Sequence, residues 1–424
     1  MSVVFGVLIF LVYSANGRAI PTLDAQPASL LPVALLRGDG LVLDRFRAYW
    51  PNGLPYSVAE RRGHIVSRYP VAIPLLAVPL MAPQIAFFDV TDPGWERDRL
   101  FPLTERMAKN AAAVIAACTS ASMLLLLRRL GFERLALATA TIAALGTDLW
   151  VMASQALWQH GPAALALTLA IVLLLPRHPG HARLALAGVA TALMVCCRPQ
   201  SFLFAASILA WVVLRHRRTA AWFMPGPLVL WAAMVGYNLW YFGSASGGYA
   251  DLAAAVPVTH NVSGYWTRDV LSGATGTLVS PSRGLFVFCP WIGLALVLLP
   301  ATYRRLQPWP LIGVLLLTLP VFLAQLAMFS IWWGGHSFGP RFWIDVTPLF
   351  AVVLNAAFEW SCERCRPMVS VLCVAGAFAI AVQTVGAFCY PSSWNHMPEN
   401  VDLRHERLWD WHDTELTRCL KEWR

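Results

Sequence analysis

Charged residues are scarce in this chain. Asp, Glu, Lys and Arg make up only 13% of its 424 residues, while 58% are hydrophobic. Soluble domains carry about 25% charged residues, so the composition excludes an ordinary soluble protein. Apolar runs of roughly 17 to 25 residues, separated by short basic turns, predict a polytopic helical membrane protein. The predicted fold class is therefore all-α.

Several local patterns are also absent. We find no internal repeat, low-complexity tract or soluble domain, and the nine cysteines show no disulfide framework. The single CxxC pair, Cys362 and Cys365, is a weak signal for zinc or redox chemistry. The histidines lack metal-ligand spacing, and neither a glycine-rich phosphate loop nor a nucleophile elbow is present. We therefore expect no metal site and no cofactor.

The basic residues indicate topology. A net charge of +9 would suggest nucleic acid as the partner of a soluble protein. Here the arginines lie mainly in turns between apolar runs, so we expect membrane lipid and no nucleic acid as a partner. Five such turns fall on one side if all are cytoplasmic: 128–134, 177–183, 215–218, 304–305 and 364–366.

This arrangement predicts about eleven spans, with the amino terminus cytoplasmic and the carboxyl terminus extracytoplasmic. The count takes Val3 to Tyr13 as a retained first span and requires that Val71 to Phe88 does not cross. We expect one membrane domain, residues 1–389, whose first outer loop is 16–107. An amphipathic extracytoplasmic tail, residues 390–424, follows it.

The unusual polar motifs then share the outer face. They lie in the segment Asn16 to Phe88, in the loops 158–161, 198–200, 243–284 and 332–341, and in the tail. Within Asn16 to Phe88, short apolar pieces alternate with charged turns, which predicts helices along the membrane surface or re-entrant helices.

Asp24 is the first candidate catalytic residue. It follows the first span by about ten residues, where an ionised carboxylate can accept a proton from an attacking hydroxyl or amine. The alternative is a helix cap, since Asp24 precedes the apolar segment Ser29 to Leu36. Asp39 and Asp44, in LRGDGLVLD, are alternative bases, although the flanking glycines give Asp39 the character of a turn.

Two arginines are candidate phosphate ligands. Arg68 and Tyr69, in HIVSRYPVA, begin an apolar segment, and arginine binds phosphate in a bidentate manner. Arg341, in WWGGHSFGPRFW, is framed by glycines and aromatic residues that let the backbone approach a ligand closely. The alternatives are a snorkelling residue for Arg68 and an aromatic-belt anchor for Arg341.

Further polar residues are candidates to line a polar cavity. Asp148 lies in the outer half of a predicted span, where an ionisable residue is a functional hypothesis by default. Gln155 follows one or two turns later and is expected to share its cavity. His160 lies in WQHG at a span mouth, and His336 lies in the glycine-rich segment before Arg341.

These motifs together resemble the GT-C superfamily of membrane glycosyltransferases. A cytoplasmic start, an aspartate soon after the first span and an [R/K]YP segment resemble the branch of protein O-mannosyltransferases and the lipid A aminoarabinose transferase. WQHG at Trp158, SPSRGLFVFCP at Ser280, GGHSFGPRF at Gly334 and RLWDW at Arg407 resemble uncharacterised bacterial members. The chain departs from the branch in its single Pro70, in Arg68 for lysine and in the lone Asp24.

The resemblance implies a function. The donor would be a polyprenyl-phosphate sugar, used on the extracytoplasmic face of the bacterial inner membrane. The acceptor would be a lipid, glycan or protein of the cell envelope. Transfer would be a metal-independent inverting displacement, in which Asp24 activates the acceptor while Arg68, Tyr69 and Arg341 bind the donor phosphate. Because the displacement is single, one carboxylate suffices, unlike the pair of a hydrolase.

Two alternatives remain open at the level of sequence. A transporter or flippase of lipid-linked sugars would explain a polar cavity, but such folds usually show inverted repeats. An O-antigen ligase or polymerase would rest on an arginine-rich outer loop, whereas the loop Gly243 to Gly284 holds only Arg268 and Arg283.

Overall fold

The computed structural model describes residues 1–422. The fold is mainly helical with almost no strands, which confirms the predicted all-α class. Within residues 1–422, six helices are long and apolar enough to cross a membrane: Ala72–Thr91, Leu100–Arg129, Ala220–Phe242, Pro310–Met328, Arg341–Arg364 and Arg366–Cys389. Most of the other predicted spans form shorter apolar helices, so the count of about eleven spans stays a prediction.

The first part of the chain forms one helix and then a mixed outer segment. Helix α1 packs along α5, and the segment that follows it builds its own apolar core with the start of α5. Helix α1 spans Ser2–Ser14. The outer segment after it consists of η1 (Leu23–Ala25), α2 (Gln26–Leu36), η2 (Asp44–Tyr49), β1 (Val58–Arg61), β2 (His64–Ser67), α3 (Ala72–Thr91) and α4 (Trp95–Asp98).

The sequence analysis expected only helices in this outer segment, and that expectation was wrong for one stretch. Strands β1 and β2 pair antiparallel, with Val58 opposite Ser67 and Arg61 opposite His64. Arg62 and Gly63 form the turn with φ values of 52° and 79°. A positive φ at both central residues is the geometry of a tight hairpin turn, and glycine adopts it without strain.

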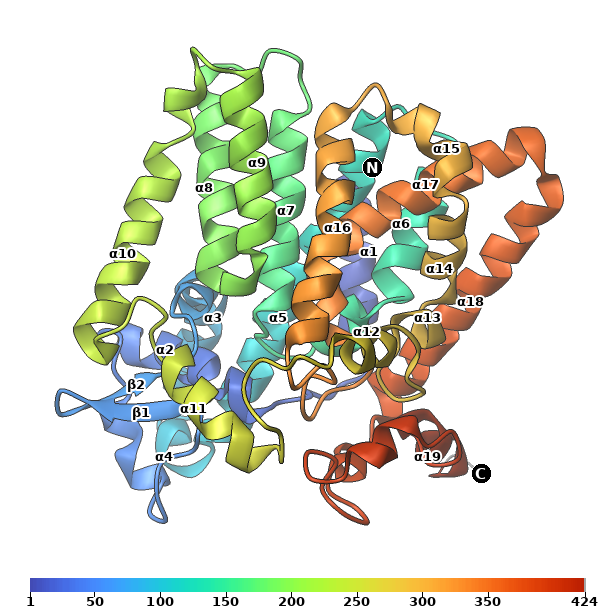
Figure 1. The fold of residues 1–424 in the computed structure, drawn as a ribbon. Coiled ribbons are helices and arrows are strands. Elements are labelled where there is room, and N and C mark those ends of the chain that lie inside the picture. Colours follow the sequence, from blue (N-terminus) through green and yellow to red (C-terminus); the bar gives the residue numbers. More distant parts are fainter. Residues whose placement is uncertain (423–424) are drawn as a thin grey trace.

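Helix α3 corresponds to the apolar stretch that was predicted not to cross the membrane. It is long and apolar enough to span, although it contains Pro79 and Pro83. Figure 1 shows it beside α2 and the hairpin, at the end of the bundle where those elements lie. Its neighbours are α2 of the outer segment and the bundle helices α5 (Leu100–Arg129) and α8 (His181–Cys197). That this stretch does not cross the membrane stays a prediction.

The main bundle follows. Its largest core includes residues of α1, α5 to α9, α13, α14 and α16 to α18. The first group of elements is α5 (Leu100–Arg129), α6 (Ala136–Leu145), η3 (Leu149–Ala153), α7 (His160–Leu174), α8 (His181–Cys197), η4 (Pro199–Ser201), α9 (Phe202–Arg215), η5 (Ala220–Trp222) and α10 (Pro225–Phe242).

The second group begins in the loop after α10. It comprises α11 (Tyr249–Thr259), α12 (Val270–Val279), α13 (Leu285–Phe288), α14 (Pro290–Val297), α15 (Leu299–Leu306), α16 (Pro310–Met328), η6 (Arg341–Val346), α17 (Thr347–Arg364) and α18 (Arg366–Cys389). The predicted span Leu285 to Leu299 is divided in two at Cys289, because Pro290 cannot continue the hydrogen bonding of α13.

The tail folds back on the bundle. It contains η7 (Ser392–Asn395), η8 (His405–Trp409) and α19 (Glu415–Glu422). A disulfide joins Cys389, at the end of α18, to Cys419 in α19. This bond corrects the expectation that the cysteines form no disulfide. The other cysteines, including Cys362 and Cys365, are free thiols.

The two ends of the bundle differ in character. Figure 1 shows the hairpin, α11 and α19 at one end, and the connections α9–α10 and α17–α18 at the opposite end. The second set contains two of the five arginine-rich turns, 215–218 and 364–366, and the first set belongs to segments that were predicted to lie outside. The side of the membrane that each end faces stays a prediction.

Candidate active site

Asp24 and Arg341 meet at the polar end of the bundle. The two guanidinium nitrogens Nη1 and Nη2 of Arg341 lie 3.4 and 3.5 Å from Asp24 Oδ2. The side chain of Arg341 is 12% exposed and that of Asp24 is 19% exposed. Residues 317 positions apart in the sequence thus form one ion pair, and the sequence analysis had nominated both.

Two phenols complete the surroundings of the carboxylate. Tyr69 Oη donates to Asp24 Oδ1 at 2.8 Å, and Tyr56 Oη donates to the same oxygen. Burial, followed by the negative charge of Asp24, raises the pKa of both phenols above the ordinary value. Both tyrosines therefore stay protonated and act as hydrogen-bond donors. Tyr56 was missed, because nothing in its local sequence distinguishes it.

The capping alternative for Asp24 does not describe the structure. The side chain of Thr22 accepts the hydrogen bond of Ala25 N at the start of η1, and α2 has no side-chain cap. The Asp24 carboxylate instead faces the two phenols and Arg341. Its geometry leaves it available to a ligand that replaces one of these donors.

The guanidinium of Arg341 lies against two aromatic rings. Its guanidinium carbon lies 4.4 Å from the ring centre of Trp158 and 5.3 Å from that of Phe342, which are cation–π distances. Its Nε is buried and has no hydrogen-bond partner. Gly334, Gly335 and Gly339, at φ values of 75°, 63° and 57°, shape the preceding loop. Residues 332–341 are called the Arg341 segment below.

A cleft opens beside this pair. It is lined by Asp24, Ala25, Ala28, Ser67, Tyr69, Pro70, Ile73, Leu157, Trp158 and Gln159. Its free space is about that of one water molecule. A sugar would therefore enter only with movement of the lining side chains.

Arg68 lies at the edge of the same site with different partners. Its Nη1 donates to the carbonyl oxygen of Tyr56 at 2.8 Å, and its Nε lies 3.5 Å from Asp251 Oδ2. A Cβ on Gly248 would overlap the backbone of Arg68, so α11 begins directly against the RYP motif. Arg68 thus fixes Tyr56 and α11, and its cation is already paired.

The other candidate bases are engaged elsewhere. Asp39 forms an ion pair with Arg45. Asp44 accepts from Ile65 N at 2.6 Å and contacts His64 Nδ1 at 2.6 Å. Both carboxylates hold the outer segment together, and among the three nominated aspartates Asp24 is the one that pairs with Arg341.

His160 belongs to a buried cluster that the sequence analysis did not assemble. Its Nδ1 lies 2.8 Å from Asp345 Oδ1, and Arg198 Nε donates to the other oxygen of that carboxylate. The Arg198 guanidinium lies 5.4 Å from the ring centre of Phe342, the ring that Arg341 also contacts. The rule that ionisable residues within predicted spans are functional candidates would have found Asp345.

Asp148 is buried against protein. Gln383 Nε2 donates to its Oδ1 at 2.6 Å, and a Cβ on Gly339 would meet the same carboxylate. Gln155, expected to share its surroundings, instead accepts from Asn16 at 2.8 Å. Asp148 thus supports the turn that precedes Arg341.

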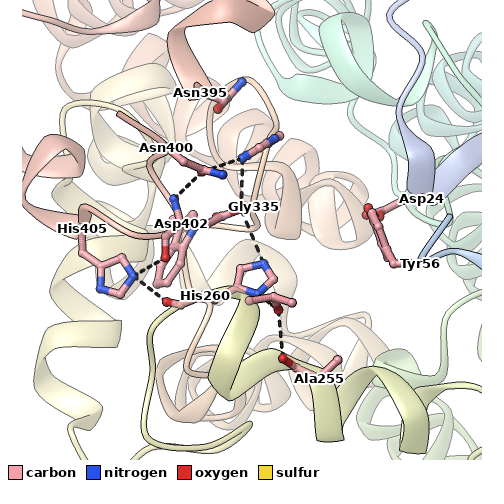
Figure 2. A network of polar contacts seen from close by, with 12 residues as sticks. Asp24, Tyr56, Ala255, His260, Gly335, Asn395, Asn400, Asp402 and His405 are labelled. Atoms are coloured by element: carbon pink, nitrogen blue, oxygen red, sulfur yellow. Dashed lines mark hydrogen bonds and ion pairs between the residues drawn. The ribbon is translucent and has the colours of Figure 1, made fainter. Parts of the chain in front are cut away.

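His336 joins a polar network formed with the tail. Its Nε2 lies 3.0 Å from Asp402 Oδ2 and 3.1 Å from Asn400 Oδ1. Burial lowers the pKa of His336, but the hydrogen bond and charge of Asp402 outweigh burial and raise it overall. Figure 2 shows Asp402 between Asn400, His260 and His405, with Asp24 and Tyr56 to one side.

Residues 1–422 contain no group of three His, Cys, Asp or Glu side chains arranged to hold a metal ion. Comparisons with protein-family models, curated proteins and solved structures find no match to this chain. Only the geometry of the site therefore bears on the function of this chain.

Proposed function

We propose that the protein is a membrane glycosyltransferase that moves a sugar from a polyprenyl-phosphate donor to an acceptor of the cell envelope. The observation that carries this proposal is the Asp24–Arg341 pair, whose carboxylate lines a narrow cleft. A carboxylate beside a cation is the minimum that an inverting transfer from a lipid phosphate needs.

The proposed reaction is a single displacement at the anomeric carbon. The acceptor oxygen or nitrogen attacks the anomeric carbon of the sugar, and the bond from that carbon to the phosphate oxygen breaks. The electron pair of that bond remains on the lipid phosphate, whose growing charge Arg341 stabilises. The acceptor proton passes to the Asp24 carboxylate, which acts as the general base.

The long Asp24–Arg341 contacts support an exchange of partners. Hydrogen bonds between N–H and oxygen are usually 2.7 to 3.2 Å, whereas these two are 3.4 and 3.5 Å. A phosphate would provide Arg341 with shorter, bidentate partners, and the buried Nε has no partner to lose. Binding of the donor would then release Asp24 toward the acceptor.

We also propose that this end of the bundle faces the extracytoplasmic side of a bacterial inner membrane. Disulfides persist in oxidising compartments, and Cys389–Cys419 lies at this end. Arg304 and Leu403 are both exposed and belong to opposite ends. With the native cysteines removed, an impermeant maleimide should label a cysteine at position 403 in intact cells and leave one at 304 unlabelled. The reverse pattern would invert the orientation.

The function is tested by incubating the purified protein in lipid nanodiscs with radiolabelled polyprenyl-phosphate sugars and envelope lipids as acceptors. Consumption of one donor, with release of the lipid phosphate, is the expected result. If no donor in the panel is consumed while the protein remains folded, the glycosyltransferase proposal is wrong.

A further inference from the structure

The tail contacts the Arg341 segment directly. Trp333 Nε1 donates to Asp402 Oδ1 at 2.8 Å, and His336 lies within 3.1 Å of both Asp402 and Asn400. Figure 2 shows Asp402 and Asn400 of the tail beside Gly335 of the Arg341 segment. Two side chains of the segment are therefore held by two residues of the tail.

Arg283 connects the same two parts of the chain from within. Its Nε and Nη2 donate to the carbonyl oxygens of Trp333 at 3.0 Å and Gly335 at 3.3 Å. Toward the tail, its Nη1 donates to Glu415 Oε1 at 2.7 Å, and its Nη2 to Asn395 Oδ1 at 3.1 Å. One buried guanidinium thus bridges the backbone of the Arg341 segment and two tail side chains.

The disulfide closes this arrangement covalently. Cys419 lies four residues after Glu415 on α19, about one helical turn away. Its bond to Cys389 fixes α19 against the end of α18. Because Glu415 sits on the fixed helix, the disulfide limits how far Glu415 can move from Arg283.

We propose that the Cys389–Cys419 disulfide and the Arg283–Glu415 pair form a clamp that holds the Arg341 segment where Arg341 reaches Asp24. Glu415 is then a positioning residue, which acts on the site through Arg283 and the segment backbone. The clamp makes the site sensitive to thiol reductants. The consequence for sugar transfer rests on the proposed function, whereas the mechanical clamp does not.

The clamp itself is tested without any activity measurement. Hydrogen–deuterium exchange of amides 332–341 is compared between the wild type and the double variant Cys389→Ser, Cys419→Ser. We expect exchange in the variant to be at least about tenfold faster, since loss of the clamp permits local opening. The matched control is Cys362→Ser with Cys365→Ser, a pair of free thiols three residues apart. Equal exchange in wild type and clamp variant would overturn the proposal.

The positioning role is tested by enzyme kinetics. Opening the clamp should raise the donor KM roughly tenfold, the size of one lost hydrogen bond to a charged group. Glu415→Ala should raise it in the same direction, because it removes the oxygen that accepts the hydrogen bond of Arg283 Nη1. In an Arg341→Ala background, neither change should have a further effect. A persistent effect in that background, or an unchanged donor KM, would show that the tail does not act through Arg341.

Failure of the two proposals is distinguishable. If the wild type transfers no sugar, the proposed function fails, while the exchange comparison still decides whether the clamp exists. If exchange rises but transfer is unchanged, the clamp holds the segment without positioning Arg341, and the positioning proposal is wrong.

Discussion

Two arginine–carboxylate pairs lie close together at the polar end of this bundle, and they differ in every respect that matters for a ligand. Arg341 and Asp24 are 12% and 19% exposed and their contacts are 3.4 and 3.5 Å long. Arg283 and Glu415 are 1% and 0% exposed, and their contact is 2.7 Å. Asp24 of the first pair lines a cleft, whereas the second pair lies inside the protein.

The two guanidinium groups differ in how many of their N–H donors have a hydrogen-bond partner. Arg283 donates to Glu415, Asn395 and three backbone carbonyls, so it has little capacity left for a ligand. Arg341 has two long contacts and a buried Nε without a partner. A ligand phosphate can improve the hydrogen bonding of Arg341 but only disrupt that of Arg283. The same pair of residue types is thus open to a ligand in one place and fully bonded within the protein in the other.

The largest expected effect is on transfer by Asp24→Asn. Loss of a general base should reduce the rate by roughly 10² to 10⁴. Asparagine keeps an acceptor oxygen for Tyr56 and Tyr69, and Thr22 provides the cap, so the melting temperature should change little. Both quantities are measured on the purified variant.

Asp39→Asn is the matched control, since it makes the same chemical change at a carboxylate that pairs with Arg45. It should transfer sugar at the wild-type rate. If Asp24→Asn is fully active and Asp39→Asn is not, the base has been assigned to the wrong carboxylate.

The next largest effect is on the free energy of unfolding, and we expect it for the buried pair of Arg283 and Glu415. Arg283→Ala leaves Glu415 as an uncompensated carboxylate and orphans several carbonyls, which typically costs about 3 to 5 kcal/mol of unfolding free energy. Arg341→Ala should cost about 1 kcal/mol or less, because its pair is partly exposed and Asp24 keeps two phenol donors. Denaturant unfolding in detergent measures both. Equal losses of unfolding free energy in the two variants would contradict the proposed difference between the two pairs.

The site pair should show its own effect in donor binding. Arg341→Ala should weaken binding of the donor by about 1.5 to 3 kcal/mol, the range for a hydrogen bond to a charged group. Arg341→Lys should restore only part of this, because the planar fork is lost. Isothermal titration with a non-hydrolysable polyprenyl-phosphate sugar gives both values. Unchanged affinity in both variants would return Arg341 to the role of an interfacial anchor.

The sequence predicted the site better than its supports. Asp24, Tyr69 and Arg341 were each visible from local pattern, and they do meet. Tyr56 was not predicted, since an isolated tyrosine in a loop carries no pattern of its own. The hairpin did have a signal in VAERRGHIVS, where Gly63 separates two short strands, but the charged turn was interpreted as a boundary between helices.

The supports were missed for a physical reason. Arg283 and Glu415 are 132 residues apart, and Cys389 and Cys419 are 30 apart, with no spacing rule that connects them. Their pairing results from the fold of the tail, which depends on packing against Trp333 and its neighbours. Periodicity reports the helices of a bundle, whereas a buried polar contact between loops leaves no period in the sequence.

The smallest expected effect is the pH dependence of the buried pair. Burial raises the pKa of Glu415 to about 7, in opposition to the nearby Arg283. Its ordinary value is about 4.5, so between these values the folded protein binds a proton that the unfolded chain has released. The contribution of Glu415 to the free energy of unfolding should therefore rise as the pH falls from about 7 toward 4.5. His336, Tyr390 and Asp148 also act on this region electrostatically.

The measurement is the difference in melting temperature between wild type and Glu415→Gln from pH 5 to 8, because the other groups contribute to both proteins. The melting temperature of the wild type should rise relative to that of the variant as the pH falls. Asp24→Asn measured over the same range provides the comparison with the exposed pair. If the difference between wild type and Glu415→Gln does not vary with pH, Glu415 does not titrate in this range. The tail would then be held by a pair that stays charged throughout, and reduction of the disulfide would be the remaining way to open it.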